Sequence, residues 1–256
     1  MAATFRQIVN NVLQNIGTAT IPAANTTITD TYQLQVANFV NHIKESCEDE
    51  NNWRPLWQDY VVSYLAGNIT QQIVDMTNAL KTPNSRSRLV RMMNRRFGRE
   101  VGLCFDITTF GIPFLLGEMP IADTKYYNTV LNQTAVAYST NYSVQDAGND
   151  IVNLLMYPGA NSTRNIQITL CTPQPRIDPT VPGSAIYPWL GTVGLDTPIL
   201  IPSMPIELGT SWYALVERGE ELGTSSMFTE DRFRSALDDA CSRDIGEAGG
   251  LEMIIA

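Results

Sequence analysis

The single histidine is the first residue to consider for chemistry, because imidazole is a common general base and metal ligand. His42 and Cys47 lie five residues apart on one predicted helix. Side chains on a helix face each other at spacings of three or four, so this spacing does not favour a Cys–His nucleophile pair. One histidine also excludes a metal site built from several imidazoles. We expect His42 to be a polar or half-buried helix residue.

Other reactive side chains form no catalytic pattern. The carboxylates at positions 220–221 and 238–239 are adjacent in sequence and splay apart, which is typical of a solvated face rather than a metal site. The chain lacks the G-x-x-x-x-G-K-[ST], G-x-S-x-G and H-E-x-x-H motifs. We therefore predict no enzyme activity, no cofactor and no metal. Four cysteines without a C-x-x-C pair are predicted to be reduced and mostly buried: Cys47, Cys104, Cys171 and Cys241.

Opposite charges gather in separate parts of the chain. Residues 81–99 hold seven of the 17 basic residues and no acid, whereas residues 205–256 hold 11 acids and four arginines. We favour charge complementarity between copies or with a partner; a nucleic-acid patch and a solvated edge strand protected by arginine remain open. The net charge of −9 disfavours a general nucleic-acid binder or a protein docked on an anionic membrane. The arginines of the predicted interface are Arg86, Arg88, Arg91, Arg95, Arg96 and Arg99.

Hydrophobic spacing predicts two helices near each end of the chain. The first runs from Phe5 to Ile16, and the second spans residues 31–50 after an Asp30 cap. A third begins near Pro205, and a fourth follows residues 225–226 and ends before Gly246. Because each amphipathic helix needs a partner, both ends are predicted to form one discontinuous bundle. Its predicted core comprises Val9, Val12, Val40, Ile43, Trp212 and Phe233.

The middle of the chain alternates with the period of β-strands. Residues 56–64 with 69–76 and residues 86–93 with 99–108 are predicted hairpins, and residues 132–142 and 165–172 are predicted strands. No crossover helix is evident, so antiparallel sheets are favoured. Eight of 14 prolines lie in residues 173–205, which predicts an extended loop. The predicted fold is α+β: a bundle of residues 1–52 and 201–256, with residues 53–200 as an inserted β-domain.

The last residues form an apolar segment behind a flexible tether. Gly249 and Gly250 precede a mostly apolar stretch with no evident core of its own. It could insert into a neighbouring subunit, pack back locally or stay loose. We include its four large apolar residues in the predicted interface: Leu251, Met253, Ile254 and Ile255.

Targeting signals are not evident. No apolar run approaches the roughly 18–20 residues of a membrane helix. Residues 1–17 lack the continuous apolar stretch of a signal peptide. We expect no membrane association, and synthesis and retention in a cytoplasm.

Short segments along the chain resemble the head-to-tail adaptor (connector) proteins of tailed phages. The likeness covers both ends and the first hairpins and leaves out residues 110–165. The segments are TFRQIVNNVL (4–13), FVNHIK (39–44), WRPL (53–56), RLVR (88–91), GREV (98–101), DTPILIP (196–202), ALVERGE (214–220) and SALDDA (235–240).

The resemblance implies a structural virion protein at the head–tail junction, assembled in the host cytoplasm. Adaptors of this kind form a ring under the portal, usually of twelve copies, and bind a downstream tail protein such as a nozzle. DNA passes through without sequence-specific binding, and an acidic surface suits such a conduit. Another tail component, a nozzle or tail-completion protein, is the first alternative. A carbohydrate-binding β-domain or an unrecognised enzyme is the second.

Overall fold

The chain combines helices with several antiparallel sheets, so the expected α+β class is confirmed. The computed structural model describes residues 2–74, 83–94, 99–108, 113–130, 137–149, 151–183, 185–187, 191–219 and 228–248. Two compact units are present. One, the helical unit, comprises Met1–Leu56 and Pro173–Ala256; the other, the β-unit, comprises Trp57–Thr172. None of the helices in the described ranges combines the length and apolar character that crossing a membrane requires.

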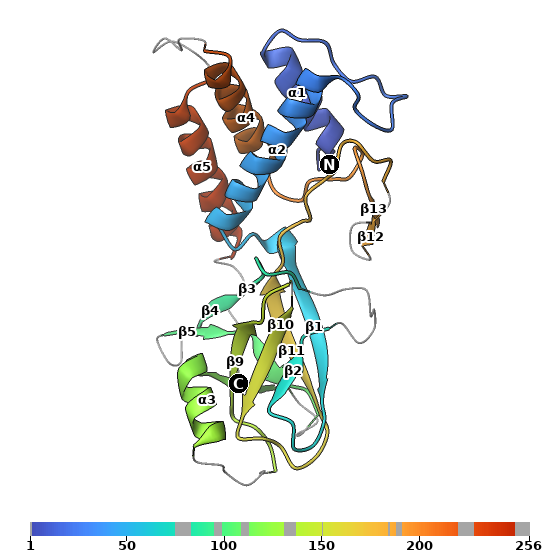
Figure 1. Ribbon diagram of the computed structural model, residues 1–256. Coiled ribbons are helices and arrows are strands. Elements are labelled where there is room, and N and C mark those ends of the chain that lie inside the picture. Colours follow the sequence, from blue (N-terminus) through green and yellow to red (C-terminus); the bar gives the residue numbers. More distant parts are fainter. Residues whose placement is uncertain are drawn as a thin grey trace. The chain divides into compact units, whose positions relative to one another are not determined.

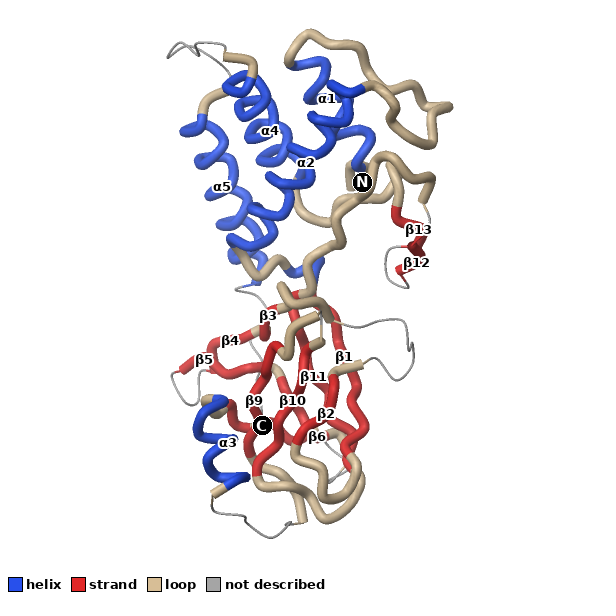
Figure 2. The backbone as a smooth tube through the Cα atoms, viewed as in Figure 1, coloured by secondary structure: helices blue, strands red, loops and turns tan. Residues whose placement is uncertain are grey.

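The helical unit contains four long helices (Figures 1 and 2). They are α1 (Phe5–Asn15), α2 (Thr31–Glu50), α4 (Ser203–Glu217) and α5 (Glu230–Ala248). A short 3-10 turn, η1 (Arg54–Leu56), follows α2, and a small hairpin of β12 (Ala185–Tyr187) and β13 (Gly191–Val193) lies within the proline-rich segment. The predicted end of the last helix was wrong, because α5 continues through Gly246 to Ala248.

Local side-chain caps fix the start of the first two helices. Thr4 accepts a hydrogen bond from the Gln7 amide, and the Gln7 side chain accepts one from the Thr4 amide, which forms a capping box. Asp30 caps α2 by accepting from the Gln33 amide, as its position in the sequence predicted. Each cap satisfies amide donors that the first helical turn leaves without an intrahelical acceptor.

Helix α4 packs against α1, α2 and α5. The contact with α2 and α5 needs a glycine, because a Cβ atom on Gly209 would lie 2.9 Å from Ile43 Cγ2 and 2.8 Å from Phe233 Cδ2. Of the six predicted core residues, Val9, Val12, Val40 and Ile43 are buried. The other two predictions need correction: Trp212 and Phe233 are half-buried. The Trp212 ring lies edge-on to Tyr213 instead, with centroids 6.3 Å apart.

Buried amide side chains hold the segment after residue 172 in the helical unit. Asn41 on α2 pairs with Ile177 in both directions: its side-chain amide donates to the Ile177 carbonyl at 2.7 Å, and its oxygen accepts from the Ile177 amide at 3.1 Å. Gln174 donates to the Pro198 carbonyl at 2.9 Å and accepts from the Leu200 amide at 2.8 Å. Both side chains are at most 2% exposed. Their hydrogen bonds therefore satisfy backbone N–H and C=O groups that would otherwise bind water.

An ion pair is completely buried beside the same segment. Lys44 Nζ lies 3.2 Å from Glu48 Oε1 one helical turn later, and both side chains are 0% exposed. Lys44 also donates to the carbonyls of Gln174 and Pro175, and Glu48 accepts from the Gln174 amide. Buried charges persist only when paired and hydrogen-bonded, so α2 and this segment depend on each other for these contacts.

A second ion pair joins α1 to the segment before α4 and predicts acid sensitivity. Arg6 binds both carboxylate oxygens of Asp196, at 2.7 and 2.9 Å, and this hydrogen bonding lowers the pKa of Asp196. The pair therefore stabilises the fold above the ordinary aspartate pKa, and this contribution is lost as pH falls through the lowered value. We expect Asp196→Asn to lose less stability than the wild type between pH 5 and pH 2 in denaturant titrations. Equal losses would contradict this assignment.

The β-unit contains two main sheets and a separate strand pair (Figure 1). The first sheet has the order β1 (Trp57–Tyr64), β11 (Arg164–Cys171), β6 (Cys104–Asp106) and β7 (Phe114–Leu115), and β3 (Arg88–Leu89) also pairs with β11. The second has the order β2 (Thr70–Gln72), β10 (Val152–Tyr157), β9 (Asn141–Asp146) and β8 (Gly117–Glu118). Strands β4 (Arg91–Asn94) and β5 (Arg99–Gly102) pair separately, and α3 (Ile121–Thr129) packs on β9 and β10. Only β8 and β9 are parallel among the pairs in the described ranges.

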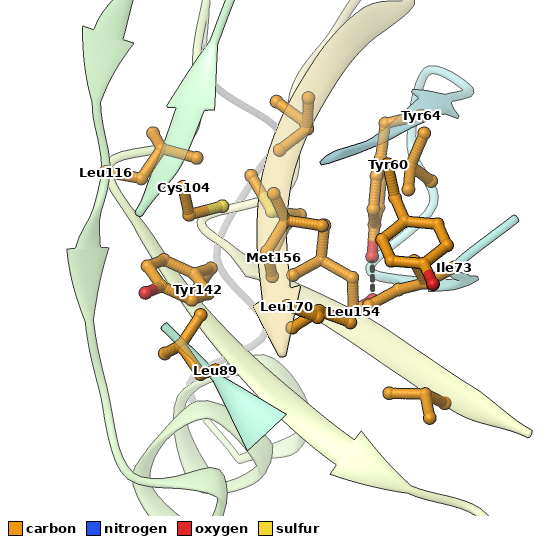
Figure 3. Close-up of a cluster of buried hydrophobic side chains, with 14 residues drawn as sticks. Tyr60, Tyr64, Ile73, Leu89, Cys104, Leu116, Tyr142, Leu154, Met156 and Leu170 are labelled. Atoms are coloured by element: carbon orange, nitrogen blue, oxygen red, sulfur yellow. Dashed lines mark hydrogen bonds between the residues drawn. The ribbon is translucent and has the colours of Figure 1, made fainter. Parts of the chain in front are cut away.

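Side chains from both main sheets form the hydrophobic core of this unit (Figure 3). Tyr60 and Leu170 come from the first sheet, and Tyr142, Leu154 and Met156 come from the second. The Tyr64 hydroxyl donates to the Leu154 carbonyl and so links the two sheets inside the core. This burial raises the pKa of Tyr64 well above that of a free tyrosine, and the phenol stays neutral.

Strand pairing differs in part from the sequence prediction. The predicted hairpin of residues 56–64 and 69–76 was wrong, because β1 pairs with β11 and β2 pairs with β10. The hairpin at 86–108 is confirmed in its central part, where Arg91 faces Gly102 and Asn94 faces Arg99. Its turn was predicted at 94–98, but Asn94 belongs to β4, and residues 95–98 lie outside the described residues. Of the strand predicted for 132–142, residues 141–142 belong to β9 and residues 137–140 are not in a strand, while residues 132–136 lie outside the described ranges. Strand β10 and helix α3 were not predicted.

Candidate interaction surfaces

The described basic residues of the predicted interface lie on, or just before, short strands of the β-unit. Arg88 lies on β3, Arg91 on β4 and Arg99 on β5, and Arg86 lies just before β3. The side chains of Arg86 and Arg88 are half-buried, whereas Arg91 is exposed. Arg95 and Arg96 lie outside the described residues, and so does Lys81. The strand register places Arg91 and Arg99 at opposite ends of one antiparallel pair.

Arg91, which is exposed, is paired within its own unit. Arg91 donates from Nε and Nη2 to the two carboxylate oxygens of Glu118, at 3.0 and 2.5 Å. This bidentate bonding raises the pKa of Arg91 above its ordinary value. Glu118 lies 27 residues away in sequence, on β8. The run of basic residues therefore carries less free positive charge in the fold than in the sequence.

A hollow of about 450 Å³ lies beside the Arg91–Glu118 ion pair, at β5 and β8. Glu100 and Val101 line one part of it, and residues 115–120 line the rest, Glu118 among them. Two carboxylates beside a paired arginine make a mixed-charge surface rather than a positive groove. A phosphate backbone needs unpaired cations to neutralise it, so this geometry does not favour the nucleic-acid interpretation.

Helix α5 carries the acidic surface of the helical unit. Glu230, Asp231, Asp238 and Asp239 are exposed. Glu230 pairs with Arg234 one turn later, and both side chains are exposed, at 46% and 68%. Since Leu237 is the only buried side chain among the α5 residues whose burial is described, most of this helix faces solvent in the single chain. An exposed acidic helix of this kind is suited to contact a basic partner.

A groove lies between α4 and α5, and no pattern in the sequence predicted it. It has a volume of about 360 Å³. Met204 on its α4 side is 65% exposed, which is unusual for a large apolar residue with a neighbouring helix to pack on. Arg232, Asp239 and Arg243 stand along its α5 side. The apolar lining residues are Pro202, Met204, Pro205, Leu208, Ala236 and Ala240.

The residues considered for catalysis do not form a reactive site where the structure places them. His42 is exposed and lies 6.2 Å, centroid to centroid, from the Tyr213 ring. Burial raises the pKa of the Cys47 thiol to about 12, so Cys47 is not a thiolate at neutral pH. Cys104 and Cys171 are buried as predicted, and Cys241 is half-buried. Within the described ranges, no three His, Cys, Asp or Glu side chains gather to bind a metal ion.

The apolar segment of the predicted interface is not placed, because Leu251, Met253, Ile254 and Ile255 lie outside the described residues.

No model of a known protein family matches the chain, and a search of curated proteins finds no significant match.

Proposed function

We propose that this protein is a head-to-tail adaptor: a structural virion protein that forms a ring under the portal and joins the capsid vertex to the tail. Its partners are then further copies of the chain, the portal protein and a downstream tail protein such as a nozzle. The chain works without enzyme activity or a cofactor, and DNA passes through the ring without sequence-specific contact. The ring has about twelve copies by resemblance to adaptors of this kind.

The observation that carries this proposal is the exposed acidic surface of α5. Among the α5 side chains whose burial is described, only Leu237 is buried. Most of the surface of α5 is therefore open to contact by another molecule. The β-unit carries arginines on short strands; Arg91 is paired with Glu118, and the remaining positive charge would meet the acidic surface of α5 on a neighbouring copy. In this proposal the terminal helices form one bundle that carries the β-unit as an insertion, and the bundle positions α5.

The test is electron microscopy of the purified protein mixed with the portal protein of the same virus. We expect rings coaxial with the portal, and saturation at a fixed number of adaptor copies by native mass spectrometry. Absence of complexes at all concentrations and salt levels would overturn the proposal. Rings that bind only tail proteins would assign the chain to another tail component.

Charge reversal on α5 tests the proposed contact. The double variant Asp238→Lys/Asp239→Lys keeps the fold, because both side chains are exposed. We expect ring assembly on the portal to weaken by at least tenfold at low salt, measured by sedimentation, because like charges then face each other. A matched control, Asp123→Lys/Asp146→Lys, makes the same change in net charge at exposed positions of the β-unit. Equal weakening by both variants would show that only overall charge matters.

A further inference from the structure

The groove between α4 and α5, defined above, is an apolar surface that the described residues leave open. Met204 is 65% exposed on one wall, and Leu208, Ala236 and Ala240 are only half-buried along the floor and the other wall. Helices α4 and α5 lie side by side (Figure 2), so the groove follows the line between them. A groove of this shape fits one extended apolar segment.

We propose that residues 251–255 of the same chain fold back into this groove. The segment begins three residues after α5 ends at Ala248. It contains four large apolar residues and one acid, and Gly249 and Gly250 precede it. Two glycines permit the chain reversal that an antiparallel return along α5 requires. The inference rests on the helical unit alone and does not depend on the proposed ring.

The lengths agree. The α5 side of the groove runs from Arg232 to Arg243, which is about 16 Å along a helix. The four steps from Leu251 to Ile255 span about 13–14 Å when extended, which is most of that length. Ala248 lies about 7.5 Å beyond Arg243 along the helix, and the three steps to Leu251 reach up to about 10 Å. Leu251 can therefore lie beside Arg243, and Ile255 can approach Arg232.

The side chains of the segment also match those that line the groove. Three successive apolar residues, Met253 to Ile255, would cover the exposed Met204 and its neighbours. Glu252 lies next to Leu251 and so falls near Arg243 in this register. A short tether gives the segment an effective concentration in the millimolar range, so its own groove is occupied before that of a second copy.

The experiment places the photoreactive residue benzoylphenylalanine at position 253 of the full-length protein. Light-induced cross-links are mapped by mass spectrometry. We expect most cross-links to fall on residues 202–208 and 232–243. Mixing unlabelled and ¹⁵N-labelled protein before irradiation separates the two sources of the segment, because folding back links only peptides of equal label. Mixed-label pairs would show that a second copy fills the groove and would overturn the proposal.

Two variants separate docking from mere proximity. Met204→Asp changes the exposed wall of the groove, and Val216→Asp makes the same change at another exposed apolar site on α4, outside the groove lining. Neither residue is buried, so both proteins should fold, which circular dichroism checks. We expect Met204→Asp to lower the yield of groove cross-links at least tenfold and Val216→Asp to change it less than twofold. Equal yields in both, or cross-links spread over the whole surface, would overturn the proposal.

Discussion

Glu48→Leu is expected to lower the free energy of unfolding by about 3–5 kcal/mol, because it leaves the Lys44 ammonium buried without its carboxylate. Both side chains of this pair are 0% exposed. The variant also removes the acceptor of the Gln174 amide, so the segment after residue 172 loses a contact with α2. Urea titration followed by circular dichroism measures the change.

The exposed pair on α5 is the matched control. Glu230 and Arg234 have the same four-residue spacing, but solvent reaches both side chains. Glu230→Leu should therefore cost less than about 1 kcal/mol. The double variant Lys44→Met/Glu48→Leu should cost less than the sum of its single changes by about 0.5–3 kcal/mol, since no lone charge remains. Equal effects at the buried and exposed pairs would refute the role assigned to burial.

Trp53→Ala is expected to have an effect of the same size, about 3–5 kcal/mol. Trp53 is 1% exposed, and its indole Nε1 donates to the Cys47 carbonyl at 2.8 Å. The substitution removes a large buried ring and leaves an acceptor near the end of α2 without this donor. Trp53→Phe keeps most of the apolar volume and should recover more than half of the loss. Chemical denaturation of the three proteins gives the comparison.

Trp212→Ala provides the contrast. The hydrophobic pattern of α4 predicted a core residue, for which truncation would cost about 3–5 kcal/mol. Because the ring is half-buried, we now expect about 1–2 kcal/mol. A loss at Trp212 as large as that at Trp53 would mean that α4 packs more tightly around Trp212 than its exposure indicates.

Helices were predictable here because their signals are local. The apolar spacing of α1 and the Asp30 cap of α2 both lie within a few residues of the structure they determine. The partial burial of Trp212 was not predictable in the same way, since it depends on which face of α4 meets α1, α2 and α5. When a helix has a broad apolar surface, its sequence alone does not determine which of its residues is most buried.

Strand partners were harder to predict because they are distant in sequence. Alternation along residues 57–64 marks a strand correctly, but Trp57 faces Cys171, far along the chain. The nearby turn made a hairpin with β2 the simpler interpretation, although the fold places β2 beside β10. Alternation identifies the buried face of a strand and not its neighbour.

The candidate surfaces illustrate the same limit. The run of arginines was visible in the sequence, but the pairing of Arg91 with Glu118 depends on the place of β8 beside β9, which no local pattern encodes. The groove between α4 and α5 arises from two helices and is not a property of either one. The apolar segment 251–255 could be recognised from its composition, whereas its proposed site needed the fold.

The helical unit uses both ends of the chain, and this has a consequence during synthesis on the ribosome. Helix α1 ends at Asn15, but its partner α4 begins at Ser203. At a translation rate of about 5–20 residues per second, α1 waits roughly 10–40 s for α4 to be synthesised. The β-unit is continuous in sequence and can fold in that interval. Until α4 arrives, apolar residues such as Phe5 and Ile8 are open to chaperones, and a nascent chain stalled before residue 203 is expected to be the form most prone to aggregate.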